Sequence, residues 1–277
     1  MSTVVGGRRE ATAIFAIYRR LVGASIRTQL QFRASLAIET IGAFAITFAD
    51  FVEVLVIFSH LPRLGTWTVE EVAFLYGSAG LGFALCDIVI GHIEKLGELV
   101  RTGRFDTILL RPAGTLVQIA GSEFALRRVG KIVQAALVLA FAMTRVDVPW
   151  TPTRLAMLVA MVVSAAAIFV AVFVATAALQ FWLIGASEVG NAVTYGGSYL
   201  TSWPLPIFGP WLRRLFAYVV PLAFCAYLPS LAVLDRPDEL GLPHWMRYAS
   251  PIVAFVVLGA SYVWWQFGVR HYRSTGS

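Results

Sequence analysis

The chain has 277 residues, of which 58% are hydrophobic and only 14% are charged, and its mean hydropathy is +0.74. Soluble domains average about 25% charged residues, so this composition excludes an ordinary water-soluble globule and a disordered chain. The formal charge of +6 does not indicate a nucleic-acid partner, because in so apolar a chain Lys and Arg mainly mark the loops that face the cytoplasm.

An amphipathic helix is the first predicted element, within a cytoplasmic tail that covers residues 1–34. Over residues 11–28, apolar side chains such as Ile14 share one face of the helix, and the opposite face carries basic side chains such as Arg19 and Arg27. A basic amphipathic helix beside an apolar stretch is typical of the membrane interface. We therefore expect this helix to lie along the bilayer surface.

Six apolar stretches are long enough to cross the hydrocarbon core, which requires about 20 helical residues. They cover residues 35–59, 69–90, 127–144, 154–184, 189–209 and 249–268. A further apolar stretch, 215–234, contains two prolines, which interrupt helices. If it belongs to an outer re-entrant segment, 210–240, most of the 22 Lys and Arg residues stay on the cytoplasmic side, whereas a seventh span would move Arg270 and Arg273 outside. The predicted fold is an all-α membrane protein with six transmembrane helices and an outer re-entrant hairpin.

The segment 88–112 is the most informative stretch outside the predicted spans. Up to residue 102 its spacing predicts a helix along the cytoplasmic surface, with apolar side chains on one face and charged ones on the other, and Gly103 is expected to terminate it. A solvated loop would account for the charged residues of this segment when they are taken by themselves. Their mixture with Phe105 favours a docking surface for a soluble partner, whose movement the helix would transmit to the second span.

Three stretches carry a resemblance to a known family. Residues 99–112, LVRTGRFDTILLRP, resemble the "vR.G.fD..LlRP" signature of ABC-2-type transporter permeases. Residues 220–229 and 268–274 are similar to the outer segment and the C-terminal motif of the short six-span members of that family. The resemblance covers nearly the whole chain, and it implies an N-terminal elbow helix, a cytoplasmic coupling helix after the second span, and re-entrant outer helices before the last span.

The same resemblance implies the partners and the location of the chain. Residues 1–277 would form a single permease domain in the bacterial inner membrane, with both termini in the cytoplasm, paired with a second permease of the same or a related sequence and with ATP-binding-cassette ATPase subunits. The residues that this analogy places at the ATPase contact are Glu94, Glu98, Arg101, Arg104, Phe105, Asp106 and Arg111. The sequence contains no G-x-x-x-x-G-K-[ST] run, so we expect no enzymatic activity and no cofactor in this chain, with ATP and Mg²⁺ bound by the ATPase. The four histidines show no paired spacing, and no metal site is expected.

Acidic side chains inside spans are candidates for the substrate pathway, because charge at membrane depth is costly and usually faces the bundle interior. The candidates are Asp50, Glu53 and Asp87. Asp50 and Glu53 are three residues apart and share a helix face, which would attract cations. The alternatives are structural. Asp50 and Glu53 would pair with Arg63 or with outer polar backbone near the membrane surface, and Asp87 and Glu39 near the inner surface would pair with Arg101 and Arg33.

The leading hypothesis for function is the membrane subunit of an ATP-driven exporter of an amphiphilic or cationic small molecule, such as a drug or natural product. One alternative is a gradient-driven secondary transporter, which would require inverted repeats and a midplane ion site, neither of which the sequence displays. The other is a membrane-embedded lipid-modifying enzyme, for which His244 beside Asp238 and Glu239 is the one candidate site. The sequence leaves the identity of the cargo and the choice between a homodimer and a heterodimer of permeases open.

Overall fold

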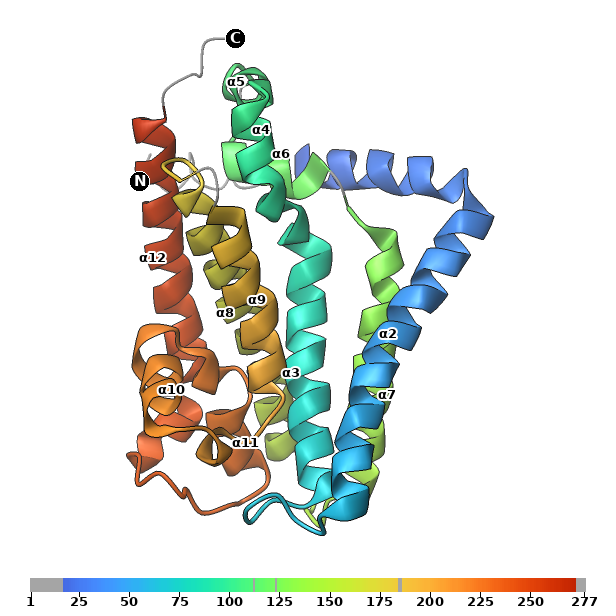
Figure 1. Cartoon of the computed structure of the whole chain (residues 1–277), viewed down its shortest axis with the longest axis vertical. Coiled ribbons are helices and arrows are strands. Elements are labelled where there is room, and N and C mark those ends of the chain that lie inside the picture. The colour runs from blue at the N-terminus through green and yellow to red at the C-terminus, as the bar shows by residue number, and fades with distance from the viewer. Residues whose placement is uncertain (1–16, 112, 123, 184–185, 273–277) are drawn as a thin grey trace.

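The computed structural model describes residues 17–111, 113–122, 124–183 and 186–272 as a bundle of long helices that run alternately up and down (Figure 1). The long helices are α2 (Arg33–His60), α3 (Val69–Ile90), α7 (Val129–Arg145), α8 (Pro152–Leu179), α9 (Ala186–Thr201) and α12 (Ser250–His271). Short elements cover the two ends of the bundle.

One end of the bundle, here the α5 end, carries a helix at residues 17–30 and the connection between α3 and α7. That connection consists of η1 (Gly91–Lys95), α4 (Leu96–Arg101), α5 (Arg104–Leu109), α6 (Thr115–Ser122) and η2 (Leu126–Arg128). The helix at 17–30 lies across this end in Figure 1, and it accounts for most of the predicted amphipathic helix 11–28. Residues 11–16 of that prediction lie outside the described residues.

The opposite end, the α11 end, carries the connection between α9 and α12 (Figure 1). It consists of η3 (Leu205–Ile207), α10 (Pro210–Arg214), η4 (Leu215–Val219), η5 (Leu222–Phe224), α11 (Tyr227–Val233) and η6 (His244–Tyr248). Pro210–Val219 and Leu222–Val233 form a helix pair bent by 77°. Because α9 ends and α12 begins at this same end, the bent pair enters and leaves the bundle on one side. Its α11 part is almost fully buried and packs against α8, which satisfies the rule that broken helices at membrane depth lie within protein.

α3 is the centre of the bundle and α2 lies at its edge. Both helices are predominantly apolar and neither has a distinct polar face, but α3 is buried along most of its length against α2, α7, α8 and α9, whereas α2 buries only Phe51 and Val54. A helix that is apolar all round and still exposed needs an apolar medium around it. This feature identifies a protein that sits in lipid.

The predicted span boundaries agree closely with α2, α3, α7 and α12, but two predicted spans are too long. The stretch 154–184 corresponds to α8, which ends at Leu179, and the stretch 189–209 corresponds to α9, which ends at Thr201. Helix α9 stops because two prolines, Pro204 and Pro206, follow it, and proline cannot donate the backbone hydrogen bond that a helix needs.

Among the described residues, four helices are long and apolar enough to cross a bilayer, and the bent pair would make a fifth if it counted as one span. The four are α2 (Arg33–His60), α3 together with η1 and α4 (Val69–Arg101), α8 (Pro152–Leu179) and α12 (Ser250–His271). Helices α7 and α9 have 17 and 16 residues, which is short of the roughly 20 that a straight crossing requires. Length and composition therefore support a multi-span helical membrane protein without reproducing the predicted count of six.

Candidate functional site

Residues 91–111, which comprise η1, α4 and α5 and are called the ledge below, project beyond α3 at the α5 end of the bundle (Figure 1). The prediction of one continuous helix over 88–102 that lies flat on the surface is wrong. The 3₁₀ turn η1 interrupts the helix, and α4 then continues outward from α3. Gly103 ends α4 as predicted, because it takes φ of 68°, in the left-handed region that glycine occupies without a steric penalty.

The apolar face of the ledge holds it in place. Ile93 and Leu96 have no exposed surface and Val100 is 4% exposed, so most of the predicted apolar face is buried, whereas Leu99 is half-buried and Val89 is exposed. The backbone N–H of Gly97 donates a hydrogen bond to the side chain of Gln180, directly after α8. This burial explains why the ledge does not lie flat, since its apolar side chains pack on the protein rather than on lipid.

Phe105 was predicted to be exposed at the ATPase contact, and the structure buries it instead. Its side chain is fully buried, with its ring centroid 5.2 Å from that of Phe181 and 4.9 Å from that of Tyr272, both in edge-to-face geometry. An aromatic side chain between two elements that lie far apart in sequence is worth more as an anchor than as an exposed contact. Phe105 therefore fixes α5 against the ends of α8 and α12 and is not available to a soluble partner.

The charged residues of the ledge separate into two groups. Glu98, Arg101, Arg104 and Arg111 are exposed, and none of them has an ion-pair partner within the described part of the chain. Glu94 instead turns inward, where it accepts a 2.9 Å hydrogen bond from the hydroxyl of Tyr195 in α9. Asp106 is half-buried beside Tyr272; burial first, and this carboxylate second, raise the pKa of the Tyr272 hydroxyl.

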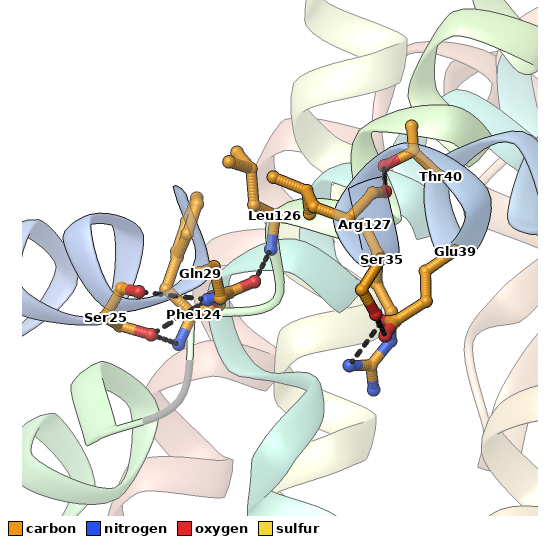
Figure 2. Close-up of polar contacts among 9 residues, drawn as sticks. Ser25, Gln29, Ser35, Glu39, Thr40, Phe124, Leu126 and Arg127 are labelled. Atoms are coloured by element: carbon orange, nitrogen blue, oxygen red, sulfur yellow. Dashed lines mark hydrogen bonds and ion pairs between the residues drawn. The ribbon is translucent and has the colours of Figure 1, made fainter. Parts of the chain in front are cut away.

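The ledge is linked to the N-terminal helix through α6. The amide of Gln118 in α6 donates hydrogen bonds to the carbonyl oxygens of Ile108 and Ala113, at 3.1 and 2.7 Å. Immediately after α6, the chain meets the helix at 17–30. Figure 2 shows Ser25 and Gln29 directed toward the backbone of Phe124 and Leu126.

Asp87, at the α5 end of α3, is part of a buried ion cluster. It has no exposed surface, and its two carboxylate oxygens lie 3.2 Å from Nη1 of Arg128 and 3.1 Å from Nζ of Lys131. Asp87 thus forms ion pairs, as the structural alternative predicted. Its partners are Arg128 and Lys131, and not the expected Arg101. Glu39 likewise pairs with Arg127, at 3.5 Å, and not with Arg33.

Asp50 lines a groove between α2, α3, α7 and α9, whose cavity volume is about 270 Å³. Its lining residues are Ile46, Thr47, Asp50, Tyr76, Gly80, Phe83, Ala84, Lys131, Gln134, Ala135, Tyr195, Ser198, Tyr199 and Ser202. Glu53 lies outside the groove and accepts a 2.8 Å hydrogen bond from the hydroxyl of Tyr199. Neither acid forms an ion pair with Arg63 within the described residues.

Sequence reasoning missed most of this groove. Lys131 and Gln134 lie three residues apart near the start of α7, and a polar pair with helical spacing inside an apolar stretch is a usable signal. The tyrosines gave no signal of this kind, because an aromatic side chain in a span is normally part of the core or of the interfacial belt.

Together these features define a class of protein: an integral membrane protein of packed helices, whose ledge after the second long helix exposes charges that have no ion-pair partner among the described residues. Residues 44–276, well over half of the chain, match the family described as ABC-2 family transporter protein, and the chain belongs to that family. The match confirms the resemblance to ABC-2-type permeases, which are the membrane subunits of transporters, and its range includes the ledge and the groove. No curated protein and no solved structure is significantly similar to the chain.

Proposed function

We propose that this chain is the membrane-spanning permease of an ATP-driven exporter in the bacterial inner membrane. In this proposal the α5 end is cytoplasmic, and α7 and α9 cross the bilayer beside the four longer helices, which gives six spans. The bent pair is the outer re-entrant hairpin. A second permease, identical or related, completes the pathway, and two ATPase subunits bind and hydrolyse ATP with Mg²⁺.

The observation that carries the proposal is a group of exposed charges on a firmly anchored ledge, without ion-pair partners in the part of the chain that the structure describes. Arg101, Arg104 and Arg111, together with Glu98, offer both signs of charge to a partner, and charged patterns of this kind select partners and fix their register. Behind them, Phe105 and the buried apolar face hold the ledge to the bundle. A surface that is charged outside and anchored inside is suited to receive force from another protein.

The contacts of the ledge also give a route for that force. Glu94 joins it to α9, Gln180 joins it to the end of α8, and Tyr272 joins it to the end of α12. If ATP binding draws two ATPase subunits together, the ledges they hold would move with them. The attached helices would then change which side of the membrane the pathway opens to.

An amphiphilic or cationic small molecule, such as a drug or natural product, is the cargo that this structure favours. Asp50 is the observation behind this choice, because it is an acidic side chain without an ion-pair partner among the described residues, in a helix otherwise suited to lipid. An acid in such a position attracts positive charge.

The proposal is tested by reversing charge on the ledge. The double variant Arg101→Glu and Arg104→Glu should insert into the membrane normally but lose co-purification of the ATPase and ATP-dependent export. Arg63→Glu, an exposed arginine at the α11 end, is the matched control and should retain both. If the double variant still binds the ATPase like the wild type, the ledge is not the contact.

The orientation is tested separately with Thr102→Cys, because Thr102 is exposed on the ledge and the native Cys86 and Cys225 are buried. A membrane-impermeant maleimide should label this variant in inverted vesicles and not in intact cells. Ser59→Cys, an exposed position near the other end of α2, should show the reverse. Labelling of Thr102→Cys in intact cells would overturn the exporter assignment.

A further inference from the structure

The groove between α2, α3, α7 and α9 contains an acid that has no partner. Asp50 has no ion pair and no hydrogen bond to its side chain within the described residues, whereas the neighbouring Glu53 is engaged by Tyr199. At 1.5 Å per residue, Asp50 lies about 15 Å from the C-terminal end of α2, well inside the hydrocarbon depth. A carboxylate at that depth is costly when, as here, Lys131 across the groove acts on it only at long range and no ion pair or hydrogen bond holds it among the described residues, and this indicates a function.

The opposite wall of the groove contains a buried amide, Gln134, which interacts with the Tyr76 hydroxyl but forms no well-aligned hydrogen bond to it. Gln134 in α7 is 2% exposed, and its Nε2 group finds no hydrogen-bond acceptor of acceptable geometry in the described part of the chain. An amide nitrogen carries two N–H donors and Tyr76 can accept only one of them, so Gln134 keeps a donor for a ligand in the cavity. Lys131, one helical turn earlier, also lines the groove, with its Nζ group 3.1 Å from Asp87 and with further N–H bonds to offer.

Aromatic side chains form much of the remaining wall. Tyr195 has its ring centroid 5.5 Å from that of Phe83, and the Nζ group of Lys131 lies 5.9 Å from the Tyr195 ring centroid. Tyr76 closes the wall beside α2, with its hydroxyl donated to the carbonyl oxygen of Thr47 at 2.7 Å. Ring faces of this kind accept both apolar groups and organic cations.

From these three features we propose that the groove is a binding site for an amphiphile that carries a protonated amine and a hydrogen-bond acceptor. The ammonium group forms an ion pair with Asp50, and the acceptor group receives hydrogen bonds from Gln134 and Lys131. The apolar body of the ligand packs against Tyr76, Phe83 and Tyr195. A bare metal ion fits poorly, because Ca²⁺ takes six to eight oxygen ligands, and the described residues offer no group of three His, Cys, Asp or Glu side chains that could hold a metal. The inference rests on the proposed function, since it gives the cargo of the exporter a specific site.

The test uses the full chain in lipid nanodiscs and three fluorescent probes of similar size. Dansylcadaverine carries a primary amine and sulfonamide oxygens, its N-acetyl derivative lacks the charge, and 6-(dansylamino)hexanoic acid carries a carboxylate instead. We expect saturable binding of dansylcadaverine, seen as enhanced dansyl fluorescence. The two analogues should bind about tenfold or more weakly, because a hydrogen bond to a charged group typically contributes that much.

Two variants test whether dansylcadaverine binds in the groove. Asp50→Asn should weaken dansylcadaverine about tenfold or more and remove the preference over the acetylated probe, and Gln134→Leu should weaken both about three- to tenfold. Glu53→Gln is the matched control, because it removes an acid one turn from Asp50 but keeps an acceptor for Tyr199, and its affinity should stay within about threefold of the wild type. Each variant is first checked for an unchanged melting temperature.

The inference is overturned if dansylcadaverine shows no saturable binding, if the three probes bind equally, or if Asp50→Asn binds like the wild type. It survives if the probe binds as expected while the ledge variants leave ATPase association unchanged, in which case the proposed function fails alone. Conversely, loss of ATPase association in the ledge variants with equal binding of all probes would overturn the inference and leave the proposed function standing.

Discussion

The guanidinium group of Arg128 lies 3.2 Å from the carboxylate of Asp87, in a buried contact that joins the start of α7 to the end of α3. Space for it comes from Gly91, because a Cβ atom at that position would overlap the Arg128 side chain. Lys131 completes the cluster at 3.1 Å and also lines the groove. One buried acid thus holds together the base of the ledge and the wall of the groove.

Replacing Asp87 with Asn should destabilise the protein by about 3–5 kcal/mol, because the buried Arg128 would lose its counter-charge, as would the partly exposed Lys131. Thermal unfolding of the purified protein in detergent, followed by tryptophan fluorescence, measures this loss. Glu39→Gln is the control: its pair with Arg127 is about half exposed on both sides and should contribute at most about 1 kcal/mol. Equal melting temperatures for the two variants would show that the Asp87 cluster is not structural.

Phe105→Ala should loosen α5 without a change at the exposed surface of the ledge. The side chain fills a site between Phe181 and Tyr272, and truncation of a buried Phe typically costs about 3–5 kcal/mol. Hydrogen–deuterium exchange should therefore accelerate over residues 104–109, and ATPase association should weaken indirectly.

Two matched variants separate anchoring from direct contact. Phe105→Leu keeps most of the apolar volume and should retain most of the protection, and Leu110→Ala, at a side chain that is 85% exposed, should leave exchange unchanged. An unchanged exchange profile in Phe105→Ala would mean that the ring does not anchor α5.

The parts of this protein that were predictable from sequence are those set by local pattern. The apolar stretches located α2, α3, α7 and α12 within a few residues, and the left-handed Gly103 followed from its position at the end of an amphipathic run. The apolar face of the ledge was also recognisable, because Ile93, Leu96 and Val100 follow helical spacing and are buried. The helical spacing of the apolar residues continues across η1 into α4, so it still identifies the buried face of the ledge.

The parts that were not predictable depend on contacts between distant segments. Asp87 was expected to pair with Arg101, which is close in sequence, but the residue that reaches it is Arg128, 41 positions away. Phe105 was assigned to the exposed surface because only its neighbours in sequence were visible. The rings that cover it come from residues 181 and 272. Single-sequence patterns give the face of a helix, but they do not give its partner.

Gln29→Leu should detach the N-terminal helix at 17–30 from the connection that precedes α7. In the native protein Oε1 of Gln29 accepts a 3.0 Å hydrogen bond from the N–H of Leu126, and its Nε2 donates to the carbonyl oxygen of Phe124 (Figure 2). Ser25 adds a second anchor, with its hydroxyl 3.2 Å from the N–H of Phe124. Leucine keeps the size of the side chain but leaves the N–H of Leu126 without its partner and the carbonyl oxygen of Phe124 with only the Ser25 hydroxyl, at a cost of about 1–3 kcal/mol.

Hydrogen–deuterium exchange over residues 17–30 and 124–128 measures this detachment, and a cost of that size should accelerate exchange about five- to a hundredfold. Thr28→Val is the control, because the Thr28 hydroxyl bonds only within its own helix, to the carbonyl oxygen of Ala24 at 3.1 Å. Because α6 connects this junction to the ledge through Gln118, Gln29→Leu should also slow ATP-dependent export while ATPase association persists. Normal export together with faster exchange would show that the helix is docked at this junction but takes no part in coupling.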